Sequence, residues 1–429
     1  MRIIYLSILG LFWGQLLPAQ GLYFPDSAGN WDSLSVQDLG YCDSRIDSLY
    51  QFLDQADSKA FILLKDGKIV LEQYFNGHSA TDNWYWASAG KTLTAFLLGQ
   101  ALADGQLSLT DSSSHYLGSG WSSCTPQQEG AIQIIHQLSM TSGLDDGVAD
   151  HTCTDDSCLI YLTNPDLRWA YHNGPYTLLD GVLTQATGLS MNQYVNQKIK
   201  QPIGMNGSFV PLGYNNVYFS TARSMARFGL LLLADGQWDG QSILSDTAYL
   251  GAMRRPSQAL NPAYGYLTWL NGQSSYLLPG SQFSFSGPLM PNAPSDCYMA
   301  LGKNGQFINV VPSENLVWIR MGQEPNGYDV PAELCNDIWS YINNLSCPSL
   351  VVELEQEKWQ LYPNPNQGEL HISGLSGAFS WRLLSIEGKV LKAGQSHNPQ
   401  LDFTSWPAAY YLLEIEQNGQ REYLNWVKY

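Results

Sequence analysis

The segment from Trp86 to Gly99, W-A-S-A-G-K-T-L-T-A-F-L-L-G, decides how the rest of the chain is interpreted. Ser88 and Lys91 stand three residues apart where a polar stretch becomes an apolar helical pattern. Residues at i and i+3 share one face of a helix, so the two side chains can touch. A serine hydroxyl becomes a useful nucleophile when a base takes its proton, and an uncharged lysine could be that base. Unpaired N–H groups at the helix start would stabilise an oxyanion at Ser88, although a serine there is also an ordinary cap.

The composition sets bounds on the class of protein. A chain of 429 residues with 44% apolar residues predicts a sizeable core and about two domains. The chain carries 38 acidic and 21 basic residues, a net charge of -17. Because nucleic acids and anionic lipid surfaces attract basic proteins, we expect neither as a partner.

The N-terminus has the pattern of a signal peptide over residues 1–20. Arg2 precedes an apolar run that extends to Leu17, and Pro18-Ala19-Gln20 follows. This run is short and is followed by a small residue at the expected cut. No later segment is long and apolar enough to predict a membrane span. We therefore expect a secreted or cell-surface protein that is exported through the periplasm.

The cysteines fit an oxidising compartment. The chain has seven, at positions Cys42, Cys124, Cys153, Cys158, Cys297, Cys335 and Cys347. None forms a C-x-x-C pair, so we expect no zinc site, and nothing else in the sequence predicts a metal or a cofactor. Cys153 and Cys158 are the best local disulfide candidates, and the partners of the others stay open.

The order of predicted elements indicates an α+β fold for residues 21–347. A helix around 43–55 precedes two apolar runs that flank Asp66-Gly67, a β-hairpin signal. A mainly helical stretch runs from 132 to 200, and strands dominate from 264 to 321 before a helix around 332–343. Strands at both ends of such a domain predict an antiparallel sheet flanked by helices, with a mainly helical region inserted.

The chain changes character after Cys347-Pro348. Residues 348–356 read as a linker, and residues 357–429 as a small all-β sandwich. Prolines, asparagines and glycines punctuate short alternating runs there. We expect this second domain to contribute nothing to catalysis.

Two further motifs have the character that a serine–lysine site needs. Tyr171 and Asn173 lie in R-W-A-Y-H-N-G-P-Y-T, where a loop leads into a helix. Lys303-Asn304-Gly305-Gln306 lies within a strand pattern.

Taken in chain order, these motifs resemble the S-x-x-K, Y-x-N and K-T-G motifs of the class C β-lactamase and penicillin-recognising serine hydrolase superfamily. The stretch from Ile134 to Leu144 also looks like this family. The resemblance covers roughly residues 43–344. It implies a β-lactamase/transpeptidase-like fold and a hydrolase that works through a covalent acyl-enzyme.

The resemblance implies roles for the first two motifs. Ser88 would be the acylated nucleophile, and Lys91 would share or shuttle its proton. Tyr171 would be the general base for acylation or deacylation, and Asn173 would orient the substrate. Lysine and tyrosine titrate near pH 10, but ammonium groups crowded around a phenol favour the phenolate and the neutral amine. Which group takes the proton stays open.

The third motif departs from the family pattern. Lys303 would line the wall opposite Ser88, and the backbone N–H of Gln306 would complete the oxyanion hole. Asn304 replaces the threonine that precedes Gly305, and this removes a hydroxyl that holds a β-lactam carboxylate. We therefore expect small esters, short amides or short peptides as substrates. A true β-lactamase, a D-amino-acid peptidase and an inactive relative that binds wall peptides are the alternatives.

Two other features have competing interpretations. His172 could be a base, but a structural or substrate-facing histidine is the simpler prediction. The acidic loop residues Asp145, Asp146, Asp150, Asp155 and Asp156 could bind calcium, but a solvated loop at the rim of the site is the simpler prediction.

The tail resembles the C-terminal sorting domain of proteins exported by type IX secretion. The resemblance rests on Y-P-N-P-N-Q-G-E-L, the I-E-G-K-V turn and a last strand that ends W-V-K-Y. It implies that the tail contacts the secretion machinery. A carbohydrate-binding or spacer module is the alternative.

Overall fold

The structure is a computed structural model that describes residues 21–27, 31–324, 331–347, 359–386 and 388–429. Its two units divide between Cys347 and Pro348. The predicted signal peptide, residues 1–20, and the predicted linker, residues 348–356, lie outside the described residues, as do positions 357 and 358.

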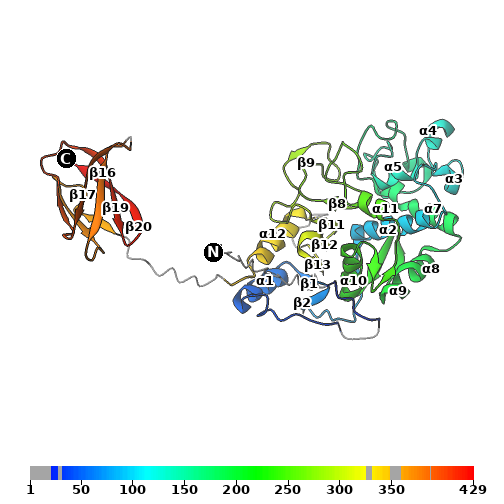
Figure 1. The fold of residues 1–429 in the computed structure, drawn as a ribbon. Helices are drawn as coiled ribbons and strands as arrows, with labels where there is room; N and C mark the ends of the chain where they lie inside the picture. The colour runs from blue at the N-terminus through cyan, green and yellow to red at the C-terminus, as the bar shows by residue number, and fades with distance from the viewer. Residues whose placement is uncertain (1–20, 28–30, 325–330, 348–358, 387) are drawn as a thin grey trace, which may run out of the picture. The chain divides into compact units, whose positions relative to one another are not determined.

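A six-stranded antiparallel sheet forms the centre of the first unit (Figure 1). Its strands lie in the order β2 (Lys68–Tyr74), β1 (Ser58–Lys65), β13 (Leu316–Gly322), β12 (Gln306–Val311), β11 (Tyr298–Gly302) and β8 (Trp269–Leu270). The predicted hairpin is the β1–β2 pair, and β1 also pairs with β13 from the other end of the domain. The α+β prediction, with its antiparallel sheet, is confirmed.

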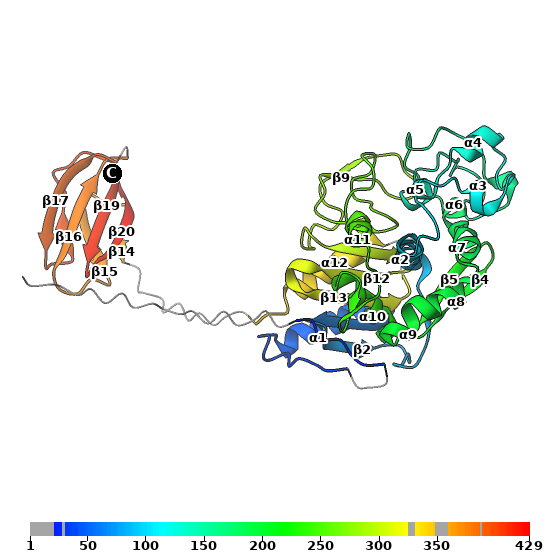
Figure 2. The same ribbon diagram turned by 45° about the vertical axis from the view of Figure 1, so that its right-hand side comes forward.

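Helices cover both faces of this sheet (Figures 1 and 2). Helices α1 (Asp43–Gln55) and α12 (Ala332–Asn343) pack together, with Phe52 stacked on Tyr341 at 4.6 Å between ring centroids. Helix α10 (Ala222–Leu233) packs on β12 and β13.

Alternate residues of the central strands face different helices, as the period of a strand requires. Trp318 contacts Trp339 of α12, with 5.7 Å between their ring centroids. Its neighbour Val317 faces α10, where a Cβ added to Gly229 would lie 2.6 Å from the Val317 Cγ1. Only glycine allows this close approach of helix to sheet. Both faces of the sheet are therefore buried.

The two ends of the first unit are joined covalently. Cys42, which precedes α1, forms a disulfide with Cys347, 305 residues later. Backbone hydrogen bonds of 2.9 Å from the Cys42 N–H to the Leu345 carbonyl, and of 2.8 Å from the Cys347 N–H to the Gly40 carbonyl, accompany it. The disulfide closes residues 42–347, nearly all of the described first unit, into one loop.

The inserted region consists of short helices around the long helix α2 (Gly90–Ala103). They are α3 (Ser114–Leu117), α4 (Pro126–Gly130), α5 (Ile134–Leu138), α6 (Asn173–Thr177), α7 (Leu179–Thr187), α8 (Met191–Val195), α9 (Gln201–Ile203) and α11 (Thr247–Met253). Between α5 and α6 the chain is almost entirely irregular, apart from the single 3-10 turn η2 (Asp156–Cys158). The predicted helical stretch therefore contains a longer loop than expected.

Short strands support this region. One small sheet holds β3 (Trp84–Tyr85), β5 (Asn215–Ser220) and β4 (Ser208–Leu212). Two further pairs are β6 (Gln237–Trp238) with β7 (Gln241–Ser242), and β9 (Ser275–Tyr276) with β10 (Phe285–Ser286). A π-helical turn, η3 (Asn196–Lys200), joins α8 to α9, and a 3-10 turn, η4 (Pro312–Glu314), joins β12 to β13.

The second unit is all β within its described residues. One sheet holds β14 (Gln360–Tyr362), β15 (Glu369–Ser373) and β18 (Gln400–Asp402). The other holds β17 (Val390–Ser396), β16 (Phe379–Leu384), β19 (Ala409–Gln417) and β20 (Gln420–Lys428). Trp426 and Phe403 belong to a core of the unit's own, with ring centroids 5.4 Å apart. The prediction of a small all-β domain is confirmed.

Candidate active site

Ser88 lies on a strained turn between β3 and α2. The 3-10 turn η1 (Ala87–Ala89) holds it, and Ala87 has a φ of +45°, which costs a non-glycine residue free energy. Trp86 fixes this turn, because its N–H donates to the Tyr218 carbonyl at 2.8 Å and its indole donates to the Ser220 hydroxyl at 2.8 Å. Ser88 is therefore presented at a fixed position at the start of α2.

Lys91 is the buried partner of Ser88. Its Nζ lies 2.9 Å from the Ser88 Oγ, the contact that the i, i+3 spacing predicts, and only 4% of the residue is exposed. Burial lowers the pKa of Lys91 to about 7, because an ammonium group loses its hydration in the interior. A large fraction of Lys91 is therefore uncharged at neutral pH and able to accept a proton.

Two tyrosine rings enclose the Lys91 amine. Its Nζ lies 5.1 Å from the ring centroid of Tyr171 and 4.3 Å from that of Tyr176. An ammonium group is stabilised over the face of such a ring. The protonated form that follows proton transfer from Ser88 would thus find a favourable environment without a carboxylate beside it.

The structure differs from the expectation that Tyr171 favours its phenolate. Burial raises the pKa of Tyr171 well above its ordinary value, and its interaction with the Ser88 hydroxyl only partly opposes this. The ring stacks on Trp269 at 5.9 Å between centroids, so aromatic surface has replaced water around it. Burial thus favours the neutral phenol of Tyr171 and the uncharged amine of Lys91.

Asn173 is the first residue of α6 and lines the same cavity. Its buried Oδ1 has no hydrogen-bond partner within the described chain, so it could accept from a substrate N–H. His172 is buried and does not line the cavity, and burial lowers its pKa to about 4. His172 is therefore neutral and set apart from the nucleophile.

The third predicted motif forms a hairpin turn, so its expected place within a strand is wrong. Gly302 ends β11 and Gln306 begins β12, and the two are paired across the turn. Asn304 and Gly305 have φ values of +63° and +78°, the left-handed conformations that a tight turn needs. Of the four predicted residues, only Lys303 lines the cavity.

The other three residues hold the turn in place. Asn304 donates from Nδ2 to the Tyr85 hydroxyl at 2.8 Å, and the Gly305 carbonyl accepts from Arg320 at 2.8 Å. The fully buried Gln306 side chain bonds the carbonyl and the N–H of Gly322. The side chain of Asn304 is therefore not placed for the predicted substrate contact. The predicted oxyanion role of the Gln306 backbone N–H stays a prediction, and Gln306 does not line the cavity.

Gly302 brings β11 against the nucleophile turn. A Cβ added to it would lie 2.5 Å from the Trp86 carbonyl oxygen and 2.9 Å from the Ala89 nitrogen. Gly302 thus approaches the backbone on either side of Ser88.

The cavity above Ser88 has a volume of about 520 Å³. Of the five acidic loop residues, only Asp146 lines it, and its carboxylate pairs with Arg168 at 2.6 Å. His151 and Thr152 from the same loop also line the cavity. The charge of Asp146 is thus largely compensated. Within the described residues, no cluster of histidine, cysteine or acidic side chains could hold a metal ion.

The loop is tied to the second motif. Cys153 and Cys158 form a disulfide. The Gly174 N–H, next to Asn173, donates to the His151 carbonyl at 2.9 Å. In the described part of the chain, Cys124, Cys297 and Cys335 are free thiols.

The Beta-lactamase family model matches residues 48–331, more than half of the chain. The chain belongs to the Beta-lactamase family. A Secretion system C-terminal sorting domain model matches residues 360–427, which implies export to the cell surface or beyond. A β-lactamase of Escherichia coli K12 is 28% identical over 130 residues, which are 29% of this chain and 33% of that protein. The match thus spans about a third of that relative's length.

Solved structures share the fold of this Beta-lactamase family domain. A Bacteroides dorei DSM 17855 protein assigned to the β-lactamases has a TM-score of 0.56 at 16% identity, over 71% of this chain and 99% of the other. A Bacillus anthracis protein assigned as a 6-aminohexanoate-dimer hydrolase has a TM-score of 0.55 at 18% identity, over 76% and 90% of the two chains. At these identities the likeness concerns the fold alone.

Sequence reasoning missed several residues of this Beta-lactamase family site. Tyr176 lies five residues after Tyr171 in the quoted motif, and its position near the start of a helix was the available signal. Tyr85 also lines the cavity, but it lies between two tryptophans and belongs to none of the three motifs. The β4–β5 residues that line the cavity are distant in sequence from every motif. Among the described helices, none has both the length and the apolar character needed to cross a bilayer.

Proposed function

We propose that this protein is a secreted serine hydrolase that forms a covalent acyl-enzyme at Ser88 on small carboxylic esters or short amides. The observation that carries the proposal is the 2.9 Å contact between the Ser88 hydroxyl and the buried amine of Lys91. A nucleophile needs an adjacent base whose pKa lies near the working pH. Burial supplies such a base here.

Acylation begins when Ser88 Oγ attacks the substrate carbonyl carbon and its proton passes to Lys91 Nζ. The carbonyl π bond opens to an oxyanion. When this intermediate collapses, the bond to the leaving group breaks, and the leaving group takes a proton from Lys91. The neutral phenol of Tyr171 can relay that proton, because a hydroxyl accepts one proton while it donates another. Water then attacks the acyl carbon and gives a proton to Lys91 Nζ. When this second intermediate collapses, the bond from the acyl carbon to Ser88 Oγ breaks, Ser88 Oγ takes the proton from Lys91, and the carboxylic acid leaves.

The oxyanion would be stabilised by backbone N–H groups. The Ser88 N–H lies in the first turn that leads into α2, and the N–H of Lys303 follows the close approach of Gly302 to that turn. We assign the second donor to Lys303 in place of Gln306. Asn173 would hold a substrate N–H through its unpartnered Oδ1.

The substrate class follows from the turn geometry of the third motif. Asn304 is bonded to Tyr85 and does not line the cavity, so this motif offers no side-chain hydroxyl to a β-lactam carboxylate. The Bacillus anthracis neighbour is named as a 6-aminohexanoate-dimer hydrolase, so this fold is compatible with substrates other than β-lactams. β-Lactamase activity remains the second candidate because of the E. coli relative.

Removal of the nucleophile or the base should abolish turnover. Ser88→Ala is expected to lower kcat for a nitrophenyl ester by at least ~10³-fold, as in other serine hydrolases. Lys91→Ala and Tyr171→Phe should be nearly as damaging. The variants are compared by initial rates and by fluorophosphonate labelling, with thermal unfolding as the control for folding. If the wild type is neither labelled by the fluorophosphonate nor active on the ester, and Ser88→Ala binds wall peptides as well as the wild type does, the protein is an inactive binder of wall peptides instead.

The pH profile should report Lys91. Only the uncharged amine accepts a proton, so kcat/KM should fall about tenfold per pH unit below about 7 and level off above it. Burial also raises the pKa of Asp180 to about 7, so the profile is repeated with Asp180→Asn. The inflection should persist in that variant. A profile that is flat between pH 5 and 8 would contradict Lys91 as the base.

Substrate preference distinguishes the proposed hydrolase of small esters or short amides from a β-lactamase. We expect kcat/KM to be higher for a short-chain nitrophenyl ester or a D-amino-acid amide than for a chromogenic cephalosporin. A site that lacks one specific hydrogen bond loses several kcal/mol of transition-state stabilisation, of the order of 10²-fold or more. A kcat/KM for the cephalosporin equal to or above that for the ester would favour β-lactamase activity instead.

We also propose that the tail acts only in export, through contact with the secretion machinery. A chain that ends at Cys347 keeps the Cys42–Cys347 disulfide and should retain its kcat and its unfolding midpoint, because the tail has a core of its own. The same chain should remain inside the cell, measured by cell fractionation. Export equal to that of the full chain would refute the sorting role, and binding of the isolated tail to a polysaccharide would favour the carbohydrate module.

A further inference from the structure

The β4–β5 hairpin contributes a wall of the cavity above Ser88. Leu212 at the end of β4 and Asn215, Asn216 and Val217 at the start of β5 line the cavity. None of these residues belongs to the three motifs. The hairpin therefore lines the cavity but supplies none of the proposed reacting groups.

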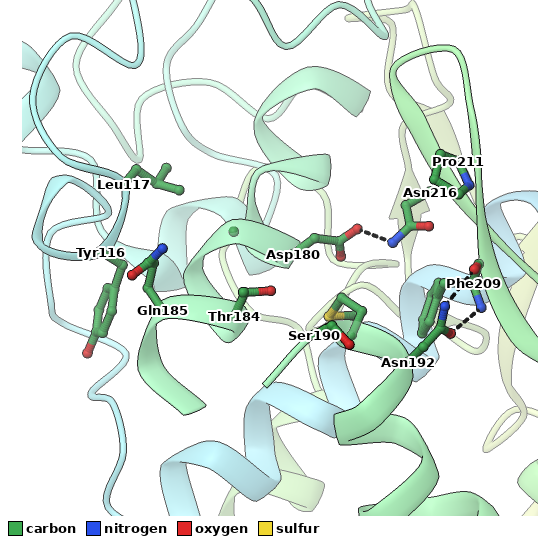
Figure 3. A pocket seen from close by; sticks show the side chains of 12 residues that line it. Tyr116, Leu117, Asp180, Thr184, Gln185, Ser190, Asn192, Phe209, Pro211 and Asn216 are labelled. Carbon is green, nitrogen blue, oxygen red and sulfur yellow. Dashed lines mark hydrogen bonds between the residues drawn. The ribbon is translucent and has the colours of Figure 1, made fainter. Parts of the chain in front are cut away.

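Helices α7 and α8 hold the inner part of this hairpin, as Figure 3 shows. The side chain of Asn192, in α8, donates to the Phe209 carbonyl at 2.9 Å and accepts from the Phe209 N–H at 2.7 Å. In the middle of Figure 3, Asn216 donates from Nδ2 to the Asp180 carboxylate at 2.8 Å. The second contact fixes a residue that itself lines the cavity.

The tip of the hairpin is held from the other side, by the disulfide loop. The Tyr214 hydroxyl donates to the Asp155 carboxylate at 2.5 Å, a short charge-assisted bond. Asp155 lies between Cys153 and Cys158, so the disulfide restricts its movement. The same loop supplies His151 and Thr152 to the cavity. The bond therefore ties two walls of the cavity together.

Behind the hairpin lies a second hollow, of about 460 Å³, drawn in Figure 3. Leu117, Met191 and Phe209 give it an apolar part, large enough for an alkyl chain. Asn216 lines both this hollow and the active cavity. The hydrogen bond between Asp180 and Asn216 is thus part of the partition between the two spaces.

We propose that the clamped β4–β5 hairpin is the selectivity wall of the enzyme, which restricts it to short acyl groups by closing the active cavity off from the apolar hollow. This role rests on the proposed hydrolase function. Tyr214, Asp155 and Asp180 are positioning residues, because they act through the hairpin and not on the reacting atoms. Loss of either clamp would let the wall move and admit a longer acyl chain into the hollow.

The test is the ratio of kcat/KM for nitrophenyl octanoate to that for nitrophenyl acetate. Tyr214→Phe removes one hydroxyl, and Asp180→Ala removes the acceptor of Asn216; each should raise the ratio at least fivefold. Tyr161→Phe is the matched control, since the hydroxyl of this half-buried tyrosine donates to Asn164 at 2.9 Å and Tyr161 does not line the cavity. Asp180→Asn keeps an acceptor for Asn216 and should restore the wild-type ratio to within twofold.

The outcomes separate the two proposals. An unchanged ratio in both Tyr214→Phe and Asp180→Ala, with thermal unfolding like that of the wild type, would overturn the selectivity wall alone. A larger effect of Tyr161→Phe than of Tyr214→Phe would also overturn it. If wild type shows no Ser88-dependent turnover of any ester, the hydrolase function falls and the selectivity role falls with it.

Discussion

The burial of one amine, that of Lys91, is the constraint on which the rest of the site depends. A lysine in water is charged at neutral pH and cannot take the proton of a serine hydroxyl. Here desolvation lowers its pKa to about 7 while the 2.9 Å contact keeps it on Ser88. Desolvation of this kind is a property of the whole surrounding structure, so the base exists only in the folded domain.

Several parts of the chain that are distant in sequence exclude water from the Lys91 amine. Helix α2 is buried from residue 90 to residue 101, so it is a central helix and not an amphipathic surface helix. Tyr171 and Tyr176 come from the inserted region and place their rings over the amine. The aromatic cluster that also includes Trp169, Tyr264 and Trp269 supports Tyr171 from behind. The same burial lowers the pKa of Lys91 and raises that of Tyr171, which is consistent with the different tasks proposed for the two groups.

The sequence was sufficient for the parts of the site that are local in the chain. The Ser88–Lys91 contact follows from helical spacing, and the pairing of β1 with β13 follows from strand patterns at both ends of the domain. The strand pattern around the third motif predicts a strand there, but the motif contains the turn that joins β11 to β12. Asn-Gly is one of the strongest short signals for a hairpin turn, and Asn304-Gly305 obeys it. The β4–β5 wall could not be predicted, because its contacts join residues far apart in the sequence.

The arrangement separates chemistry from selectivity. Ser88 in the turn η1 and Lys91 in the first turn of α2 are the proposed nucleophile and base, and small movements would spoil their 2.9 Å contact. The cavity walls come from a hairpin and a disulfide loop that are tied by single hydrogen bonds between side chains. Such contacts can change by one substitution without disturbing the core, whereas Gly302 and Gly229 tolerate almost nothing. Substitutions that change substrate preference are therefore expected at these walls, since the proposed reacting groups are held in place by the requirement that Lys91 stay buried.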